Sequence, residues 1–492
     1  MFSRAVYIRS LLRTRCYSSK STIFGLSSGA GKCGVAVIRV SGEASSLVVK
    51  CKTSVKTLPA PRKAVLRRIF HSRTDEIIDK GLILWFPGPN SFTGEDSVEF
   101  HVHGGVAVLN AMYDSLGSIS GVRIAEPGEF TKRAFYAGKL DLTEVEGLAD
   151  LIDAETEAQR KQALSHASGD LSKLYNQMRT KLLKCIAHVE AYIDFSEDQD
   201  IDDTVLESVR RDVNSLICEI RTHLDDHRRG ERLRTGVRMA IIGAPNVGKS
   251  SFINLLSNRK VSIVTNIAGT TRDIVESNHD IGGYPVTLAD TAGLRNYTTD
   301  VVENEGIERA RDYLQLTDIL VLMLDAGSLQ DYLSGTKKSF SSYFKDYVGS
   351  LGLSQSLISS TRLIVIVNKC DLLSKETLNL LQDEADTKIL SCHTRVGIDR
   401  VLEVITCNLK ELCGVPSREN PNLSQQRHRY HLKECVECLE KFQLHLEMER
   451  HPDLAIATQY LRNATRCIGR ITGAVQTEEI LDVIFSSFCI GK

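Results

Sequence analysis

The segment GAPNVGKS at residues 243–250 has the spacing of a phosphate-binding loop. A strand-like apolar run, RMAIIG, leads into the segment, and a helix-like run, SFINLLSN, follows, as such a loop requires. Gly243 and Gly248 let the backbone curl so that its N–H groups face the phosphates. We expect Lys249 to reach the β- and γ-phosphates and Ser250 to coordinate Mg²⁺. Taken alone, the motif also occurs in chance loops.

Further motifs follow this loop in the order of a GTPase, namely GTTRD (269–273), DTAG (290–293), NKCD (368–371) and SCHT (391–394). Asp371 can accept hydrogen bonds from both the ring N–H and the exocyclic amine of guanine, whereas adenine offers no such donor pair. We therefore expect GTP or GDP as the nucleotide, with SCHT closing over the base. We also expect Asp290 to hold Mg²⁺ through water and Thr271 to contact it directly.

The residues that would activate the attacking water are unusual. Leu294 follows Gly293 at the position where Ras-like proteins carry a glutamine, and a leucine side chain cannot orient a water molecule. Either hydrolysis is very slow, or another group does this work. The sequence identifies no arginine finger. Asn246 offers a side-chain oxygen that suits a monovalent cation, which could supply the missing positive charge.

The composition is that of a folded protein with several domains, because the chain has 492 residues, of which 42% are hydrophobic and 25% charged. Its net charge of −1 excludes the global positive field of dedicated nucleic-acid binders. No apolar run approaches the roughly 18 residues of a membrane span, so we expect no integral membrane segment. Cys435 and Cys438 have C-x-x-C spacing but lie in a helical pattern, which favours a core or surface helix over a metal site.

Sequence patterns divide the chain into five segments. Short strands at 35–40, 81–86 and 98–102 alternate with Gly/Pro turns, which indicates an α+β domain. The buried strands MAIIG, ILVLMLD and LIVIVN indicate a doubly wound α/β domain. We predict a multidomain fold in which this Ras-like P-loop GTPase domain is inserted into a discontinuous all-α helical domain. The predicted segments are 1–20, a transit peptide; 21–140, the α+β domain; 141–234, the first helical part; 235–410, the GTPase domain; and 411–492, the second helical part.

The first twenty residues, MFSRAVYIRSLLRTRCYSSK, contain four arginines and no acidic residue. The first acidic residue of the chain is Glu43. An Arg-rich, Ser-rich and acid-poor segment is typical of a mitochondrial transit peptide. We therefore expect the mature protein in the mitochondrial matrix, and a disordered basic tail is the alternative.

Beyond residue 20, the chain closely resembles the MnmE/TrmE family of tRNA-modification GTPases in its mitochondrial form. Many other proteins share the GTPase motifs, whereas the N-terminal block and the terminal FCIGK single out this family. The stretches that carry the resemblance are GVAVIRVSG (34–42), LWFPGPNSFTGEDSVEFHVHGG (84–105), PGEFTKRAFYAGKLDLTEVEGLADLIDA (127–154), GAPNVGKSSFINLL (243–256), VTNIAGTTRD (264–273), DTAGLR (290–295), GIERA (306–310) and IFSSFCIGK (484–492).

The resemblance implies a potassium-dependent GTPase. In the family, K⁺ takes the place of an arginine finger and becomes ordered when two G domains meet across a homodimer. Here the ion would be bound by Asn246, by the backbone oxygens of Thr265 and Ile267, and by Thr270. This assignment agrees with the side-chain oxygen that Asn246 offers inside the phosphate loop.

The resemblance also implies that Glu303 positions the attacking water. Glu305 is a weaker candidate, considered because the segment RNYTTDVVE is one residue longer than the family pattern, and a solvated carboxylate at a helix start is the bland alternative. The predicted catalytic residues are Glu303, Lys249 and Cys489, and the predicted metal ligands are Asn246, Ser250, Thr265, Ile267, Thr270 and Thr271. The predicted contacts of the nucleotide and its ions are Asn246, Val247, Gly248, Lys249, Ser250, Ser251, Thr265, Asn266, Ile267, Ala268, Gly269, Thr270, Thr271, Asp290, Thr291, Ala292, Gly293, Asn368, Lys369, Asp371, Ser391, Cys392 and His393.

The N-terminal domain resembles a tetrahydrofolate-binding fold. Arg39, Glu99 and Lys139 match positions that contact 5-formyl- or methylene-tetrahydrofolate in the family, and Lys492 joins them with its ammonium and carboxylate groups. A carboxylate can pair with the donor edge of a pterin, and cations suit the glutamate tail of a folate. Surface salt bridges are the alternative for Arg39 and Lys139. Cys489 either attacks C6 of a uracil ring or only lines the pocket; prenylation is disfavoured because CIGK is a poor C-a-a-X box.

By resemblance, the chain would act with an FAD-dependent, MnmG-like partner at C5 of the wobble uridine (position 34) of mitochondrial tRNAs. The folate would supply the one-carbon unit, and GTP hydrolysis would drive conformational cycling. The stretch RHRYHLK (427–433) is either a local basic contact for tRNA or a helix face wetted by solvent.

Two other functions agree less well with the sequence. A switch GTPase in mitochondrial ribosome assembly or translation would carry RNA-binding modules instead of the folate-like block and FCIGK. An independent one-carbon enzyme with a regulatory G domain is disfavoured, because residues 21–140 show no nucleophile or acid/base constellation. His101 and His103 alternate on one strand and are expected to be packed or hydrogen-bonded instead of catalytic.

Overall fold

A computed structural model describes residues 21–55, 57–195, 204–257, 276–289, 314–334, 339–354, 358, 361–382, 387–417, 421–448, 453–475, 478–486 and 488–491. The predicted transit peptide lies outside the described residues. The chain forms two compact units. The first unit comprises Met1–Ala149, Leu171–Arg179 and Arg466–Lys492, and the second comprises Asp150–Asp170 and Thr180–Thr465.

The first unit is built on a six-stranded sheet with the order β3-β4-β5-β2-β1-β6. Only the β1–β6 pair is parallel. Strands at the three predicted places are confirmed, each longer than predicted. The strands are β1 (Thr22–Leu26), β2 (Cys33–Ser41), β3 (Val65–Phe70), β4 (Ile77–Phe86), β5 (Ser97–Gly104) and β6 (Val122–Ile124).

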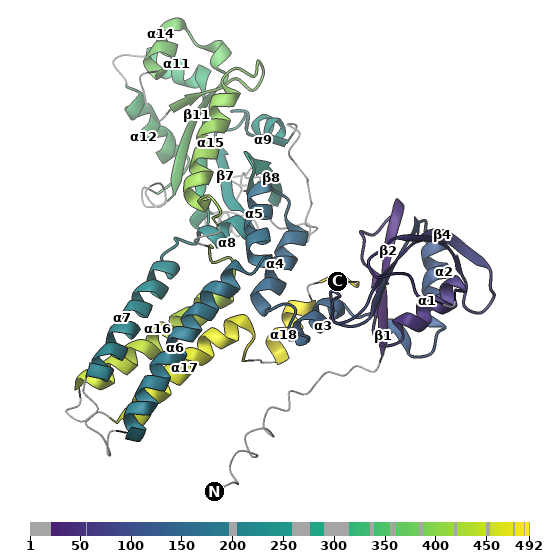
Figure 1. The fold of residues 1–492 in the computed structure, drawn as a ribbon. Helices are drawn as coiled ribbons and strands as arrows, with labels where there is room; N and C mark the ends of the chain where they lie inside the picture. Colours follow the sequence, from purple (N-terminus) through teal and green to yellow (C-terminus); the bar gives the residue numbers. More distant parts are fainter. Residues whose placement is uncertain are drawn as a thin grey trace, which may run out of the picture. The chain divides into compact units, whose positions relative to one another are not determined.

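Helices α1 (Ser45–Thr53) and α2 (Val106–Gly117) cover one face of this sheet (Figure 1). Alternate residues of the strands, such as Ile38, Val40 and Phe100, are fully buried in the core beneath these helices. Because side chains alternate along a strand, Arg39 and Glu99 project from the opposite face. The predicted α+β character is therefore confirmed.

The same unit ends in a small helical layer. It contains α3 (Glu129–Tyr136), the first part of α4 (Leu142–Asp153) and α18 (Glu478–Ser486). One apolar cluster joins the N-terminal and C-terminal segments of the chain, so the C-terminal helix belongs to the N-terminal fold. This cluster consists of Phe135, Leu142, Val145, Leu481, Phe485 and Phe488.

The second unit holds another six-stranded sheet, with the order β12-β11-β10-β7-β9-β8. All neighbours are parallel except β8 and β9. The strands are β7 (Val237–Gly243), β8 (Glu276–Ile281), β9 (Tyr284–Ala289), β10 (Ile319–Asp325), β11 (Arg362–Asn368) and β12 (Thr387–Ile389).

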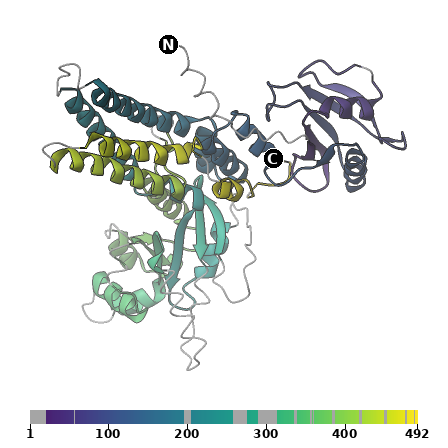
Figure 2. The ribbon, with the colours of Figure 1, turned by 90° about the horizontal axis from the view of Figure 1, so that it is seen from below.

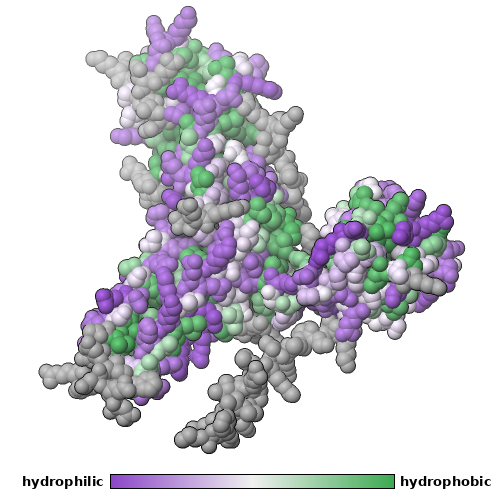
Figure 3. Space-filling model, viewed as in Figure 1, coloured by the Kyte–Doolittle hydropathy of each residue, from purple (hydrophilic) through white to green (hydrophobic). Residues whose placement is uncertain are grey.

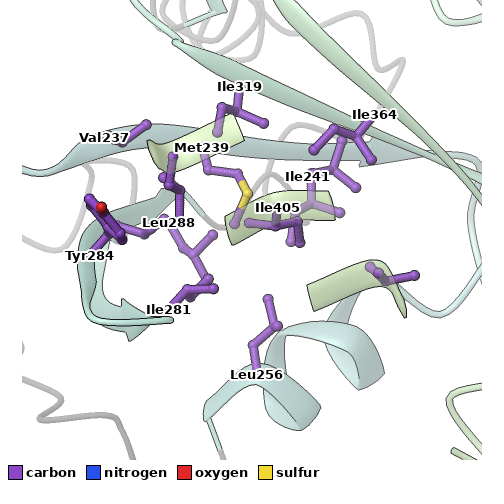
Figure 4. Packing of buried hydrophobic residues seen from close by; sticks show 14 of the residues in the cluster. Val237, Met239, Ile241, Leu256, Ile281, Tyr284, Leu288, Ile319, Ile364 and Ile405 are labelled. Carbon is purple, nitrogen blue, oxygen red and sulfur yellow. The ribbon is translucent and has the colours of Figure 1, made fainter. Parts of the chain in front are cut away.

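Helices cover both faces of this sheet, as the doubly wound prediction expects. Met239 and Ile241 of β7 pack with Ile319 and Ile364 on one face, where Ile405 of a covering helix meets them (Figure 4). A second cluster on the other face includes Leu322 and Leu324. The helices of this region are α9 (Lys249–Ser257), α11 (Ala326–Ser334), α12 (Phe340–Ser350), α14 (Lys375–Gln382) and α15 (Ile398–Cys413).

Long helices precede and follow this sheet in the sequence. Helix α7, which precedes the sheet, runs beside α16, which follows it (Figures 1 and 2). Ion pairs of Arg210 with Glu447 and of Arg221 with Glu440 join the two helices. These helices are α5 (Glu157–Ala167), α6 (Asp170–Phe195), α7 (Thr204–Leu224), α8 (Arg229–Thr235), α16 (Gln426–Met448) and α17 (Leu454–Thr472).

The stretch RHRYHLK lies on α16 and is only partly exposed, so the interpretation as a helix face wetted by solvent is wrong for its buried residues. Arg429 is mostly buried and donates to Asp226 Oδ1 over 2.5 Å. His428 and His431 are also buried, whereas Tyr430 and Lys433 are exposed. The stretch is therefore neither a wholly solvated helix face nor an open basic patch, because α7 and the segment after it cover one side.

The helix predicted around Cys435 and Cys438 is confirmed. Cys435 is fully buried in it. Among the described residues, no helix is long and apolar enough to cross a membrane. Hydrophobic residues are exposed among hydrophilic ones on the first unit in Figure 3. Leu66 and Leu82, which pair across β3 and β4, are among the exposed hydrophobic residues of this unit.

Candidate functional site

The phosphate-binding loop joins β7 to α9, as predicted. Gly243 ends β7, and a Cβ atom there would lie 2.4 Å from the carbonyl oxygen of Met323 on β10. Gly248 has φ +102°, and its Cβ would lie 2.2 Å from Asn368 Nδ2. Gly243 is required because the neighbouring strand approaches it closely. Gly248 is required both by a close contact and by its backbone angle. The loop is held in a tight curl at the end of the sheet.

The side chains of the loop are arranged around its own backbone. Lys249 Nζ donates to the carbonyl oxygens of Gly243 at 2.9 Å and Ala244 at 3.0 Å. Asn246 is exposed and has φ +60°, a conformation that asparagine tolerates better than most residues. Ser250 and Ser251 lie in the first turn of α9, where backbone N–H groups favour an anion. The loop therefore suits a phosphate chain, because the Lys249 ammonium already lies against its backbone.

A single buried amide connects the phosphate loop to the predicted base loop. Asn368 ends β11 and is 1% exposed. Its Nδ2 donates to the carbonyl oxygen of Val247 over 2.7 Å, and its Oδ1 accepts from the N–H of Cys392 over 3.0 Å. Asn368 therefore fixes the distance between the two loops, although they lie far apart in the sequence.

The predicted base-recognition carboxylate is oriented by the base loop. Ser391 Oγ donates to Asp371 Oδ1 over 2.5 Å. This hydrogen bond holds the pKa of the Asp371 carboxyl below its ordinary value, so the carboxylate is ionised at neutral pH. An ionised carboxylate is acceptor-only and matches the two N–H donors of guanine. His393 of the same loop is exposed.

Lys369 and Cys392, in the two motifs predicted to bind the base, make contacts within the protein. Lys369 has φ +63°, and its Nζ pairs with Asp325 Oδ2 at 2.7 Å. Burial raises the pKa of the Cys392 thiol to about 11, so this thiol is neutral and unreactive near neutral pH. Sequence reasoning missed Asp325, although it follows the buried strand run ILVLML and so marks the carboxyl end of a parallel strand.

Sequence reasoning also missed Tyr347. Its hydroxyl accepts from the N–H of Ala244, at the start of the phosphate loop, over 2.5 Å. It also donates to the carbonyl oxygen of Met323 over 2.8 Å. No motif marks this tyrosine, because its contact with the loop spans about a hundred residues of sequence.

Part of the predicted site lies outside the described residues. Within the part of the chain that the structure describes, no group of three or more His, Cys, Asp or Glu side chains could hold a metal ion. The predicted site residues outside the described ranges are Thr265, Asn266, Ile267, Ala268, Gly269, Thr270, Thr271, Asp290, Thr291, Ala292, Gly293, Glu303 and Lys492.

A second cluster lies on the face of the N-terminal sheet opposite α1 and α2, beside Phe130 of α3. Arg39 and Glu99 are directly opposite each other on β2 and β5. Arg39 donates from Nε at 3.1 Å and Nη2 at 3.0 Å to Glu99 Oε1. The guanidinium lies 5.1 Å from the ring centroid of Phe92 and 5.9 Å from that of Phe130. With side chains 22% and 19% exposed, this pair is half-buried and is no ordinary surface salt bridge.

The histidines on β5 bond to carboxylates and not to each other. His101 Nε2 lies 3.4 Å from Glu99 Oε2, and His103 Nδ1 lies 2.9 Å from Asp79 Oδ1. These contacts agree with the hydrogen-bonded role predicted for both side chains. His101 therefore extends the Arg39–Glu99 pair along the sheet.

The C-terminal tail returns to this cluster. Gly25 of β1 is directly opposite Arg39, and a Cβ on Gly25 would lie 2.9 Å from Gly491 Cα. Ser27 Oγ donates to the carbonyl oxygen of Gly491 over 2.8 Å, and Ile490 forms a β-bridge with Pro127. The tail therefore packs against the N-terminal fold, as expected if the terminal FCIGK contributes to that domain. Any side chain at position 25 would displace the tail.

Cys489 and Lys139 lie near this cluster but are not part of the ion pair. Cys489 is exposed, and its carbonyl oxygen accepts a long hydrogen bond, 3.5 Å, from the N–H of Gly128. Lys139 is exposed. Its Cε lies 3.6 Å from the place that a Cβ atom on Gly94 would occupy, and Gly94 is two residues after Phe92. The structure therefore brings Arg39 and Glu99 together and places Lys139 beside the loop that carries Phe92.

Comparison with protein families finds two matches along the chain. Residues 22–139 match the model described as the GTP-binding protein TrmE N-terminus. Residues 142–489 match the model described as the MnmE helical domain. Together these matches extend over nearly the whole described chain.

Similar curated proteins cover the chain almost end to end. The mitochondrial 5-taurinomethyluridine-[tRNA] synthase subunit GTPB3 of Danio rerio is 50% identical over 495 residues, which are 98% of this chain and 96% of that protein. The Homo sapiens protein of the same name is 48% identical and covers 96% of this chain and 94% of its own length. The tRNA modification GTPase MnmE of Rickettsia akari (strain Hartford) is 44% identical and covers 96% and 100%.

The position of Asp371 makes nucleotide preference testable. We predict that Asp371→Asn weakens GTP binding about a hundredfold, because the new amide presents a donor to the exocyclic amine of guanine. Xanthosine triphosphate, which carries an oxygen at that position, should bind the variant more tightly than GTP. Competition binding to the full chain measures both affinities. An unchanged preference for GTP would show that Asp371 does not contact the base.

Proposed function

The chain belongs to the MnmE/TrmE family of tRNA-modification GTPases, and from this premise we propose that it hydrolyses GTP during C5 modification of the wobble uridine, position 34, of mitochondrial tRNAs. The observation that carries the GTPase part is the Asn368 amide, which joins the phosphate loop to the loop of Ser391. The tRNA part is supported by relatives named as a 5-taurinomethyluridine-[tRNA] synthase subunit that match 94–96% of their own length.

In the nucleotide site, each described residue has a distinct task. Lys249 would bind the β- and γ-phosphates, and Ser250 would coordinate Mg²⁺ from the first turn of α9. Asp371 would select guanine. Asn246 would hold K⁺ with Thr265, Ile267 and Thr270, and the ion would supply positive charge in place of an arginine finger. Glu303 would orient the attacking water in place of the glutamine absent from position 294.

A one-carbon site on the N-terminal sheet is the second part of the proposal. A tetrahydrofolate derivative, when bound, would supply the one-carbon unit. The Arg39–Glu99 pair offers a carboxylate for a pterin donor edge and two aromatic rings, those of Phe92 and Phe130, as flat apolar walls. Because Arg39 contacts Glu99, both belong to the same end of the ligand. Lys139, which is outside this pair, would then be the cation for the glutamate tail.

The C-terminal tail would complete this one-carbon site. Gly491 packs on Gly25, beside Arg39, and Lys492 follows directly in the sequence. Lys492 would add a cation for the folate. The exposed Cys489 would either line the pocket or attack C6 of the uracil. In that attack the thiol would first lose its proton; the thiolate would then form the Sγ–C6 bond while the C5=C6 π bond opens and its electron pair moves to C5 and O4.

Assembly and location complete the proposal. The chain would form a homodimer, work with an FAD-dependent MnmG-like partner on mitochondrial tRNA, and reside in the mitochondrial matrix after removal of residues 1–20. Relatives from Danio rerio and Homo sapiens are named mitochondrial. The insertion of the GTPase domain at 235–410 into the helical domain is supported by the packing of α7 on α16. The match over residues 22–139 disfavours a translation GTPase that shares only the G domain.

Loss of the protein should remove the modification from mitochondrial tRNA. We predict that a deletion strain lacks the C5-substituted wobble uridine and accumulates the unmodified base, because the GTP hydrolysis proposed for this chain is lost with it. Nucleoside mass spectrometry of purified mitochondrial tRNA measures this loss. Re-expression of the intact chain is the control. Normal C5-modified uridine in the deletion strain would refute the proposed function.

Replacement of Asn246 should separate ion dependence from nucleotide binding. We predict that Asn246→Ala loses the stimulation of GTP hydrolysis by potassium, at least about tenfold, while GDP affinity changes less than about threefold. The reason is that the exposed amide holds the ion, whereas the backbone and Lys249 hold the phosphates. Turnover of the wild type and the variant is compared in potassium and in sodium. Hydrolysis with unchanged potassium dependence would make the ion assignment wrong.

Glu99 should affect folate binding without affecting GTP hydrolysis. We predict that Glu99→Gln weakens binding of 5-formyltetrahydrofolate about tenfold or more, since the amide removes an ionised acceptor and leaves Arg39 without its partner. Glu43→Gln, which changes an exposed carboxylate of the same unit, should bind normally. Calorimetry on the full chain measures the affinities. Equal affinities in all three proteins would remove Glu99 from the site.

A further inference from the structure

We propose that Tyr347 of α12 is a positioning residue for the phosphate-binding loop. The proposal rests on the proposed nucleotide site and names a residue that its motifs do not include. The Tyr347 hydroxyl receives the N–H of Ala244 at 2.5 Å and donates to the carbonyl oxygen of Met323 at 2.8 Å. The hydroxyl therefore bridges the end of β7 to the end of β10, with one hydrogen bond on each side.

The N–H of Ala244 needs such a partner for a simple reason. The pairing of β7 with β10 ends at Gly243 and Met323, so Ala244 is the first residue beyond the ladder. N–H groups of a phosphate loop and of the helix N-terminus after it can bind an anion, whereas the N–H of Ala244 already donates to the Tyr347 hydroxyl. An unpaired backbone N–H that is shielded from water destabilises the fold. A phenol hydroxyl both donates and accepts, so Tyr347 extends the ladder by one step.

Ala244 is held from its other side by the phosphate-binding lysine. The carbonyl oxygen of Ala244 accepts from Lys249 Nζ at 3.0 Å, while its N–H donates to Tyr347. Both polar backbone groups of one residue are thus engaged. A shift of Ala244 would move its carbonyl oxygen, which accepts a hydrogen bond from the Lys249 ammonium. Tyr347 would therefore act on the phosphates only through Ala244 and Lys249.

Neighbouring aromatic side chains hold Tyr347 in place. The rings of Tyr343 and Tyr347 stack, with centroids 5.8 Å apart and planes at 22°. Tyr332 meets Tyr343 edge-on at 5.0 Å, and the Tyr332 hydroxyl donates to Asp346 Oδ2 at 2.6 Å. Stacked and edge-on rings restrict each other's rotation. The hydroxyl of Tyr347 is therefore pre-organised, which a positioning role requires.

Removal of this hydroxyl tests the proposal in the full chain. We expect Tyr347→Phe to release a fluorescent GDP analogue about tenfold faster and to raise the KM for GTP by a similar factor. The kcat at saturating GTP should stay within about twofold, because the described hydrogen bonds of Tyr347 reach only the backbone of Ala244 and Met323 and so act on phosphate binding. Stopped-flow fluorescence and steady-state kinetics provide these numbers.

Tyr343→Phe is the matched control, because it removes a hydroxyl from the stacked partner one helical turn away. Among the described hydrogen bonds, none joins Tyr343 to the phosphate loop, so its release rate and KM should match the wild type. Calorimetry of both nucleotide-free variants distinguishes a local effect from unfolding, and the expected unfolding temperatures are similar. A comparable increase in release rate for Tyr343→Phe would overturn the proposal.

Other outcomes are equally decisive. An unchanged release rate and KM in Tyr347→Phe, with normal binding by the wild type, would overturn the role of Tyr347 alone. A fall in kcat with unchanged KM would also overturn it, since it would place the effect on the chemical step. Failure of the wild type to bind GDP would overturn the proposed nucleotide site itself.

Discussion

The buried side-chain amide of Asn368 is the interaction on which the nucleotide site depends. It ends β11 and hydrogen-bonds to Val247 in the phosphate loop and to Cys392 in the base loop. A nucleotide presents its base and phosphates at a fixed separation, so the two loops must hold the same separation before binding. One planar amide with a donor and an acceptor meets this need at the edge of a parallel sheet, where two strand ends come close. Gly248 is required here because any side chain would occupy the position of the amide.

In the N-terminal unit, an ion pair joins the two strands that carry the proposed one-carbon site. Arg39 and Glu99 face away from the core on neighbouring strands, and the tail reaches the same strip through Gly25 and Gly491. The tail can approach so closely only because both contact points are glycines. The apolar cluster around Phe485 anchors α18 and so directs the last residues to β1. Packing thus places a chain terminus beside a charged pair.

The local surroundings shift the pKa values of the polar groups in these sites. The Ser391 hydroxyl lowers the pKa of the Asp371 carboxyl, whereas burial raises the pKa of the Cys392 thiol to about 11. The two groups belong to adjacent loops yet have opposite electrostatic roles. On α16, Arg429 is drawn into an ion pair with Asp226 and is unavailable to an outside ligand. Residue type alone does not distinguish these cases.

The sequence by itself determined the local chemistry of this protein. The phosphate loop, the alternation of strands and helices, and the position of Asp371 after a buried strand follow from patterns a few residues long, because backbone preferences and side-chain periodicity act over that range. Only the tertiary structure decided that Tyr347 holds Ala244, that Arg39 belongs with Glu99, and that one side of the RHRYHLK helix is covered. Each of these contacts joins residues that are dozens to hundreds of positions apart. Their formation depends on strand order and helix packing, which no short pattern encodes.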